Sequence, residues 1–74
     1  MYVIQHKPGY NILHELDKKT LGLAKKAYPD HRFTVISGIA AHHWVRDGGH
    51  HSTPLYISST VGGKGRIRYA RDAS

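Results

Sequence analysis

The sequence predicts an α+β domain in which one helix packs on one face of a small antiparallel sheet, with its elements in the order β-α-β-β-β. Three observations favour this fold class. The chain has 74 residues, which is the size of a single domain. One stretch has apolar residues at helical spacing, and several short runs of strand-forming residues are separated by glycine and proline turn signals. We therefore expect residues 1–74 to form one domain, with the last few residues frayed.

The first half of the chain is expected to contribute one strand and the helix. Residues 2–6, Tyr-Val-Ile-Gln-His, are rich in strand formers and precede a Lys-Pro-Gly turn signal. The helix is predicted to begin near Asp17 or Thr20, either of which can cap it, and to end at Tyr28, because a proline follows. Residues 11–16 are interpreted either as the first turns of this helix or as an irregular approach to it.

The second half of the chain is expected to form the rest of the sheet. Strands are predicted over residues 32–36, 44–45, 55–57 and 66–69. The Asp-Gly-Gly sequence at residues 47–49 is a hairpin signal, and a Gly-Gly-Lys-Gly segment is expected to form a flexible turn before the last strand. One helix followed by antiparallel strands is typical of an α+β domain.

The composition is basic, rich in histidine and free of cysteine. The chain has 11 Lys and Arg against 5 Asp and Glu, 7 His and no Cys, which gives a formal net charge of +6. The absence of cysteine excludes disulfides, Cys-containing zinc fingers and thiol nucleophiles. Apolar residues make up 39% of the chain and are spread along it, which favours a folded domain over a disordered basic tail. No run approaches the roughly 18 apolar residues of a spanning helix, so we expect a cytoplasmic protein that does not contact a membrane.

The positive charge forms two clusters that flank a neutral middle. One cluster lies on the predicted helix and the other in the last turn and strand. If Ile67 and Tyr69 are buried beneath the helix, the arginines between and before them point to the opposite, open face of the sheet. Paired arginines on such a face suit bidentate contacts with phosphate or carboxylate, whereas the helix lysines can also be interpreted as a solvated polar face. The residues predicted to bind an anionic partner are Lys64, Arg66, Arg68 and Arg71, with Lys18 and Lys25 on the helix.

These residues predict a non-catalytic binding module whose partner is nucleic acid or a nucleoprotein complex. Coulomb attraction to phosphates would supply much of the affinity. No serine lies in a nucleophile-elbow pattern, and a chain of 74 residues has little volume for a pocket that excludes water, so we expect no enzyme activity. No cofactor is predicted. Pairing of two copies through an edge strand of the sheet is left open.

The histidines raise the alternative of a metal-binding protein. Two adjacent pairs, at residues 42–43 and 50–51, bracket the predicted hairpin turn, and strand geometry lets at most one member of each pair face a given site. With a two-residue loop the imidazoles lie too far apart, but a wider loop would place His43 opposite His50. We predict no dedicated metal site and name these two as the candidate ligands. Each histidine is expected to titrate near pH 6.5, so binding to an anionic partner should strengthen below about pH 6.5.

The layout resembles that of small phage-encoded proteins, among them some anti-CRISPR proteins. The resemblance rests on the strand at residues 2–6, the short basic helix Thr-Leu-Gly-Leu-Ala-Lys-Lys-Ala at residues 20–27, and the start of a sheet at residues 33–35. It implies an inhibitor of a host defence complex that acts by protein contact in the host cytoplasm. Buried aromatic and apolar residues carry interface energy. For that alternative the predicted contact residues are Trp44, Arg46, Leu55 and Tyr56.

Overall fold

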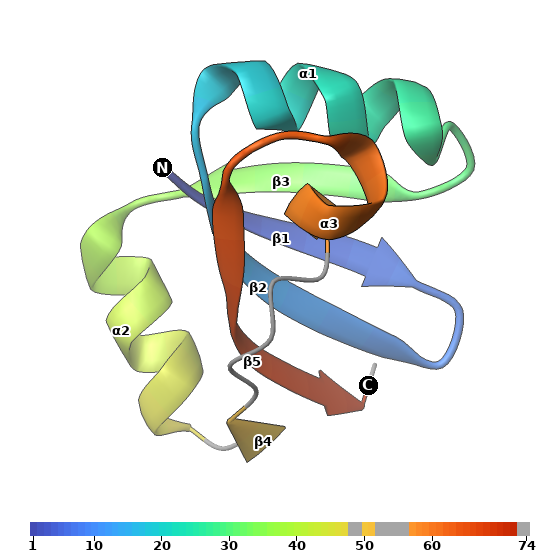
Figure 1. The fold of residues 1–74 in the computed structure, drawn as a ribbon. Helices are drawn as coiled ribbons and strands as arrows, with labels where there is room; N and C mark the ends of the chain where they lie inside the picture. The colour runs from blue at the N-terminus through green and yellow to red at the C-terminus, as the bar shows by residue number, and fades with distance from the viewer. Residues whose placement is uncertain (48–49, 52–56, 73–74) are drawn as a thin grey trace.

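The computed structural model of the chain describes residues 1–47, 50–51 and 57–72, with side chains at positions 1–47 and 57–70. These residues form an antiparallel sheet with the strand order β3-β1-β2-β5-β4 and three helices packed on it (Figure 1), so the predicted α+β class is confirmed. The elements are β1 (Tyr2–Lys7), β2 (Tyr10–Leu16), α1 (Lys18–Ala27), β3 (Arg32–Ile36), α2 (Gly38–Arg46), β4 (His50–His51), α3 (Ile57–Val61) and β5 (Gly65–Asp72). In the part of the chain that the structure describes, no helix has the length and apolar character that a membrane span requires.

The second strand, β2, occupies residues that the sequence analysis assigned to the start of the helix or to an irregular approach. It forms a hairpin with β1 through a tight turn in which Gly9 has a φ of 94°, a value that glycine adopts readily. Successive side chains of β2 point to opposite faces, and Ile12 and Leu13 are both buried because both faces of the sheet are covered. Covering both faces removes the alternation of apolar and polar residues by which a strand is recognised, which explains the missed strand.

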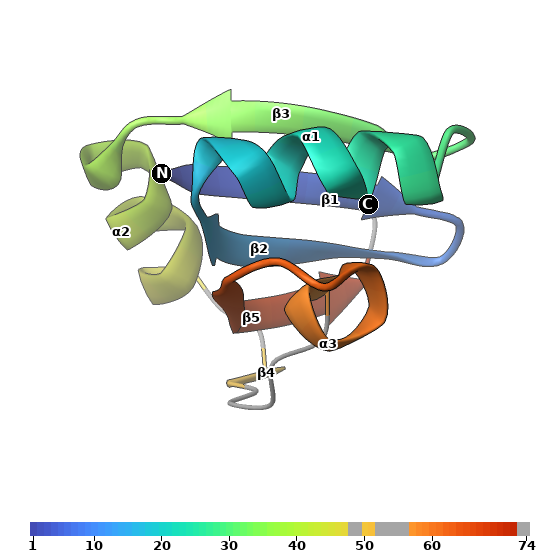
Figure 2. The ribbon, with the colours of Figure 1, turned by 45° about the horizontal axis from the view of Figure 1, so that its top comes forward.

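The first helix begins and ends as the sequence predicts. Asp17 is its N-cap, and Oδ1 of this residue accepts a hydrogen bond from the backbone N–H of Thr20 at 2.7 Å. Together with α3, this helix covers one face of the sheet, which we call the α1 face (Figure 2). The core on this face consists of Val3, Leu16, Leu21, Ala24 and Ile57.

The second helix, α2, covers the opposite face, which we call the α2 face, and it replaces the strand predicted at residues 44–45. Ser37 caps this helix, because its Oγ accepts a hydrogen bond from the backbone N–H of Ala40 at 3.1 Å. Trp44 is only 9% exposed and packs against Ile4 and Leu13 of the sheet. The strand predicted before the Asp-Gly-Gly turn is therefore wrong, because those residues are helical. Residues 48–49 of the predicted turn lie outside the described part of the chain.

A short helix and the last strand complete the fold. Ile57 begins α3 instead of ending a strand, and residues 55–56 lie outside the described residues. Gly62 has a φ of 79°, and its backbone N–H donates to Ser58 O at 2.9 Å, so the predicted glycine turn leads from α3 into β5. The last strand spans Gly65–Asp72 and contains the strand predicted over residues 66–69.

Candidate anion-binding site

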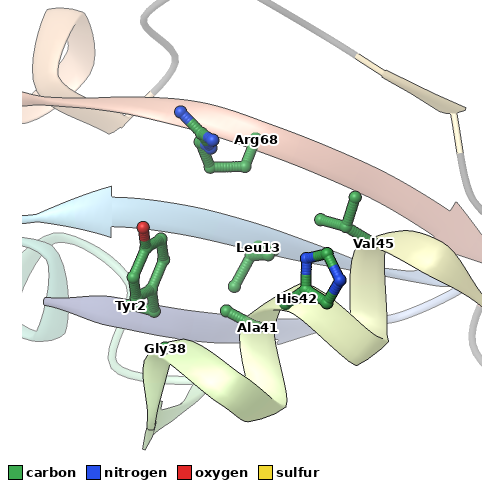
Figure 3. A pocket seen from close by; sticks show the side chains of 7 residues that line it. All are labelled: Tyr2, Leu13, Gly38, Ala41, His42, Val45 and Arg68. Carbon is green, nitrogen blue, oxygen red and sulfur yellow. The ribbon is translucent and has the colours of Figure 1, made fainter.

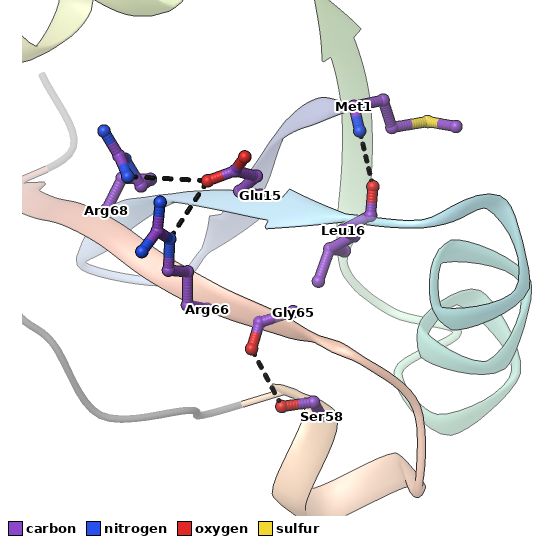
Figure 4. A network of polar contacts seen from close by, with 7 residues as sticks. All are labelled: Met1, Glu15, Leu16, Ser58, Gly65, Arg66 and Arg68. Carbon is purple, nitrogen blue, oxygen red and sulfur yellow. Dashed lines mark hydrogen bonds and ion pairs between the residues drawn. The ribbon is translucent and has the colours of Figure 1, made fainter.

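Two arginines of β5 share one carboxylate oxygen. Arg66 donates from Nε to Glu15 Oε1 at 3.0 Å, and Arg68 donates from Nη1 to the same oxygen at 3.5 Å (Figure 4). The side chains of Arg66, Arg68 and Glu15 are 56%, 38% and 38% exposed. Ion pairs this exposed contribute about 0–1 kcal/mol to stability. The main effect of Glu15 is therefore to hold the two guanidinium groups next to each other, with one positive charge in excess.

A β-bulge in β5 aims Arg68 into this arrangement. The register pairs Leu13 with Tyr69 but His14 with Ile67, so Arg68 is the extra residue of β5. Ile67 is buried on the α1 face, whereas Tyr69 packs with the core of the α2 face. The assumption that these two residues share one face is wrong, because the bulge reverses the alternation between them.

The arginines nevertheless lie on the side of the sheet that faces away from α1, as expected. Arg66 pairs with Glu15, whose side chain shares the α2 face with Leu13. This face is not open along its whole extent, because α2 covers part of it. Arg66 and Arg68 lie beside the covered part, so the arginines border a packed helix and not a bare sheet.

A small pocket opens between α2 and the sheet, next to Arg68. Its volume is about 130 Å³, which is below the roughly 300–1,000 Å³ of sites for drug-sized ligands. Figure 3 shows Tyr2 and His42 on either side of the apolar floor, with Arg68 projecting from β5. The hydroxyl of Tyr2, the imidazole of His42 and the guanidinium of Arg68 can all donate hydrogen bonds, so the rim suits an anionic oxygen. The lining residues are Tyr2, Leu13, Gly38, Ala41, His42, Val45 and Arg68.

Lys64 lies at the other end of the arginine pair. Its backbone N–H donates to Thr20 Oγ1 at 2.6 Å, which ties the start of β5 to the first turn of α1. Lys64 and Arg66 line a shallow hollow together with Glu15 and Asp17. The pKa of Asp17 is lowered first by its hydrogen bonds with Thr20 and further by the nearby charges of Lys64 and a second lysine. We call the row formed by Lys64, Arg66 and Arg68 the basic strip.

Two of the remaining residues predicted for anion binding, Lys18 and Lys25, are not part of this row. Lys18 and Lys25 are exposed on α1, which covers the other face of the sheet. The backbone of Arg71 pairs with Asn11, and the side chain at position 71 lies outside the described residues. Of the five predicted residues whose side chains the structure describes, three are thus brought together.

Of the residues predicted for protein contact, the structure describes only the two that lie on α2. Trp44 belongs to the core of the α2 face, so it cannot anchor a partner at the surface. Arg46 is exposed at the end of α2. Leu55 and Tyr56 lie outside the described residues. The predicted contact surface therefore loses its central aromatic residue.

The two candidate metal ligands belong to different elements, α2 and β4. His43 is exposed on a helix, where the strand argument for adjacent histidines does not apply. The backbone of His50 pairs with Ala70 in β4, and its side chain lies outside the described residues. Among the side chains that the structure describes, no group of three or more His, Cys, Asp or Glu residues could hold a metal ion.

Two histidines depart from the expectation that all seven titrate near pH 6.5. His14 is fully buried, and burial lowers its pKa to about 4, with a further contribution from the charge of Lys7. The pKa of His6 is lowered by partial burial and by the charge of Arg32, while a hydrogen bond with Asn11 opposes this change. His14 therefore takes up a proton only well below the pH assumed for all the histidines, and His6 takes up a proton at a lower pH than an ordinary histidine.

The sequence analysis did not identify Tyr2 and His42 as site residues. Both border the pocket only because α2 folds back over β1 and β2, and α2 was assigned to the sheet. The helical spacing of Ala41, Trp44 and Val45 on one side of residues 38–46 was the signal that could have placed His42. Comparisons with protein families, with curated proteins and with solved structures found no match.

Proposed function

We propose that this protein is a non-catalytic binding module that holds the phosphate backbone of nucleic acid along its basic strip. The observation that carries the proposal is the sharing of one Glu15 oxygen by Arg66 and Arg68. Two cations opposite one exposed carboxylate leave an unbalanced positive charge at the surface. A phosphate group can neutralise this excess positive charge without a change in the fold.

The chemistry of the guanidinium group favours phosphate as the partner. Arg66 contacts Glu15 through Nε, which directs its two terminal nitrogens away from that bond. Those nitrogens form a planar fork that matches two oxygens of one phosphate. On the other side, Arg68 reaches the rim of the pocket, where Tyr2 and His42 add further donors. A phosphate or sugar oxygen bound at this rim would meet donors from three elements of the fold.

The length of the basic strip favours a polymer over a single small anion. Lys64 and Arg68 are four residues apart on an extended chain, which corresponds to about 13 Å at ~3.3 Å per residue. Several phosphates of one strand fit along that length. The net charge of +6 adds a long-range attraction that speeds encounter with any polyanion.

The proposal is tested by measuring fluorescence anisotropy of labelled single-stranded DNA, single-stranded RNA and duplex DNA at ~50 mM salt. The double variant R66Q/R68Q should lose about tenfold or more in affinity, whereas K18Q/K25Q, which removes the same charge from α1, should lose about threefold or less. Equal losses would mean that only net charge matters. Absence of binding to all three probes would contradict the proposal, and retention of a protein from nuclease-treated lysate would then favour the inhibitor interpretation.

A further inference from the structure

The strand β3 forms an edge of the sheet, and its only charged residue is Arg32 at its first position. It pairs with β1 on one side, and no other strand of the described residues pairs with its outer side. Edges are commonly protected by lysine, proline, a bulge or a very short strand. Residues 32–36 contain neither lysine nor proline, and their register with β1 runs without a shift. The opposite edge, β4, is only two residues long.

The side chains along β3 add an apolar surface to this edge. Val35 is 54% exposed, although it lies in the middle of a strand. It shares the α1 face with Phe33, which is partly buried against the core there. Thr34 is exposed and lies on the α2 face. The edge therefore offers unpaired backbone groups and an apolar side chain together.

We propose that two copies of the chain pair in antiparallel fashion along β3, with Thr34 of one copy opposite Thr34 of the other. Among symmetric registers, this one pairs all five residues of the strand. It places Phe33 opposite Val35 of the second copy, and aromatic with β-branched pairs and pairs of threonines are both favourable across strands. The occupant of the edge is thus a second copy of the same segment.

Charge and the placement of the helices agree with this register. Arg32 faces Ile36 of the second copy, so the two arginines at position 32 are about 13 Å apart along the strands at ~3.3 Å per residue. From the end of β3, α2 runs toward β4 and away from the outer edge (Figures 1 and 2). Neither the two Arg32 residues nor α2 therefore obstructs the second copy.

The pairing is separate from the basic strip, because β1 and β2 lie between β3 and β5. If the proposed function holds, a dimer would carry two basic strips and bind long nucleic acids with added avidity. The dimer itself does not depend on that function. Its test therefore uses no nucleic acid, and the two proposals can fail independently.

The experiment is sedimentation velocity of the full chain from micromolar to millimolar concentration. We expect a dimer that forms with increasing concentration. Thr34→Lys and Thr34→Glu each place two like charges directly opposite at the centre of the pairing, and each should raise the dimer dissociation constant by about tenfold or more. An equal mixture of the two variants pairs opposite charges and should restore the dimer. Circular dichroism checks that both variants remain folded.

Gly22→Lys is the matched control for added charge. It introduces the same charge on the exposed side of α1, where an added Cβ meets no atom within 4 Å, and it should leave the dimer intact. The proposal is overturned if the wild type stays monomeric at every concentration, or if Thr34→Lys leaves the dimer unchanged. It is also overturned if the mixture of Thr34→Lys and Thr34→Glu stays monomeric, or if Gly22→Lys weakens the dimer as much as Thr34→Lys.

Discussion

His14 donates a hydrogen bond from Nε2 to Oε1 of Gln5 at 2.9 Å, and both side chains are fully buried. The amide of Gln5 in turn donates from Nε2 to Nδ1 of His31 at 2.7 Å, and the ring of His31 stacks on Tyr28. This orientation of the amide requires His14 to carry a hydrogen on Nε2. The second nitrogen, Nδ1, is buried without a partner among the described residues, so a proton added there would have no acceptor.

The buried imidazole predicts that stability falls as the pH is lowered from about 6.5 to about 4. In the unfolded chain the pKa of His14 returns to 6.5, whereas in the folded chain burial holds it at about 4. Between these values the unfolded state binds a proton that the folded state does not, so unfolding becomes more favourable, by up to about 3 kcal/mol. Urea denaturation of the wild type at several pH values measures the slope. The variant His14→Gln should show a shallower slope, and equal slopes would disprove the assignment.

Two glycines are predicted to respond to alanine with opposite signs. An added Cβ at Gly63 would lie 2.7 Å from Cβ of Thr20 and would collide with its hydroxyl, which accepts the hydrogen bond from the backbone of Lys64. Gly63→Ala should therefore destabilise the fold by about 1–3 kcal/mol. Gly22→Ala adds a methyl group to open space within α1 and should stabilise the fold by up to about 1 kcal/mol. Denaturant midpoints of both variants measure these changes in stability. Destabilisation by Gly22→Ala would contradict the packing described for α1.

Removing the shared carboxylate is predicted to strengthen binding to nucleic acid. In Glu15→Gln, phosphates no longer compete with Glu15 for the two arginines, so affinity should rise by about threefold or more at low salt. Stability should change by less than about 1 kcal/mol, because the ion pairs are exposed. Asp30→Asn removes one exposed negative charge elsewhere and serves as the matched control for net charge. If both variants gain equally in affinity, Glu15 has no special relation to the site.

The pocket predicts that one of two neighbouring histidines contributes to binding. His42 lines the pocket beside Arg68, whereas His43 follows it on α2 and does not line the pocket. The imidazole of His42 can donate a hydrogen bond to an anionic oxygen at the rim. His42→Ala should therefore weaken binding to nucleic acid more than His43→Ala does, which fluorescence anisotropy measures. Equal effects of the two variants would contradict a role of the pocket in binding.

Local signals were sufficient for part of this fold. The cap at Asp17 and the proline after Tyr28 set the bounds of α1, and the strand formers at residues 32–36 predicted β3. The N-cap of α2 at Ser37 was not predicted. Tryptophan and valine at residues 44–45 favour strands by composition, but in α2 their burial against the sheet outweighs that preference.

The candidate site was predictable only where it depends on alternation along one strand. Arg66 and Arg68 were predicted to share one side of the sheet because they are two residues apart, and both contact Glu15 there. The bulge at Arg68 could not be predicted, since it depends on the register with β2, a strand that was itself missed. Glu15 contacts the arginines, and His42 lines the pocket beside Arg68. Both relationships depend on the packing of elements far apart in sequence, which local sequence patterns do not reveal.

The dependence of binding on salt tests the central claim about the basic strip most directly. If Lys64, Arg66 and Arg68 each neutralise one phosphate of a duplex, the logarithm of the association constant should fall against the logarithm of salt concentration with a slope of about −2.7. The variant R66Q/R68Q should reduce the slope to about −0.9, while K18Q/K25Q should leave it close to the wild-type value. The assignment of nucleic-acid binding to the basic strip would be contradicted if R66Q/R68Q left the slope unchanged. It would also be contradicted if K18Q/K25Q reduced the slope as much as R66Q/R68Q does.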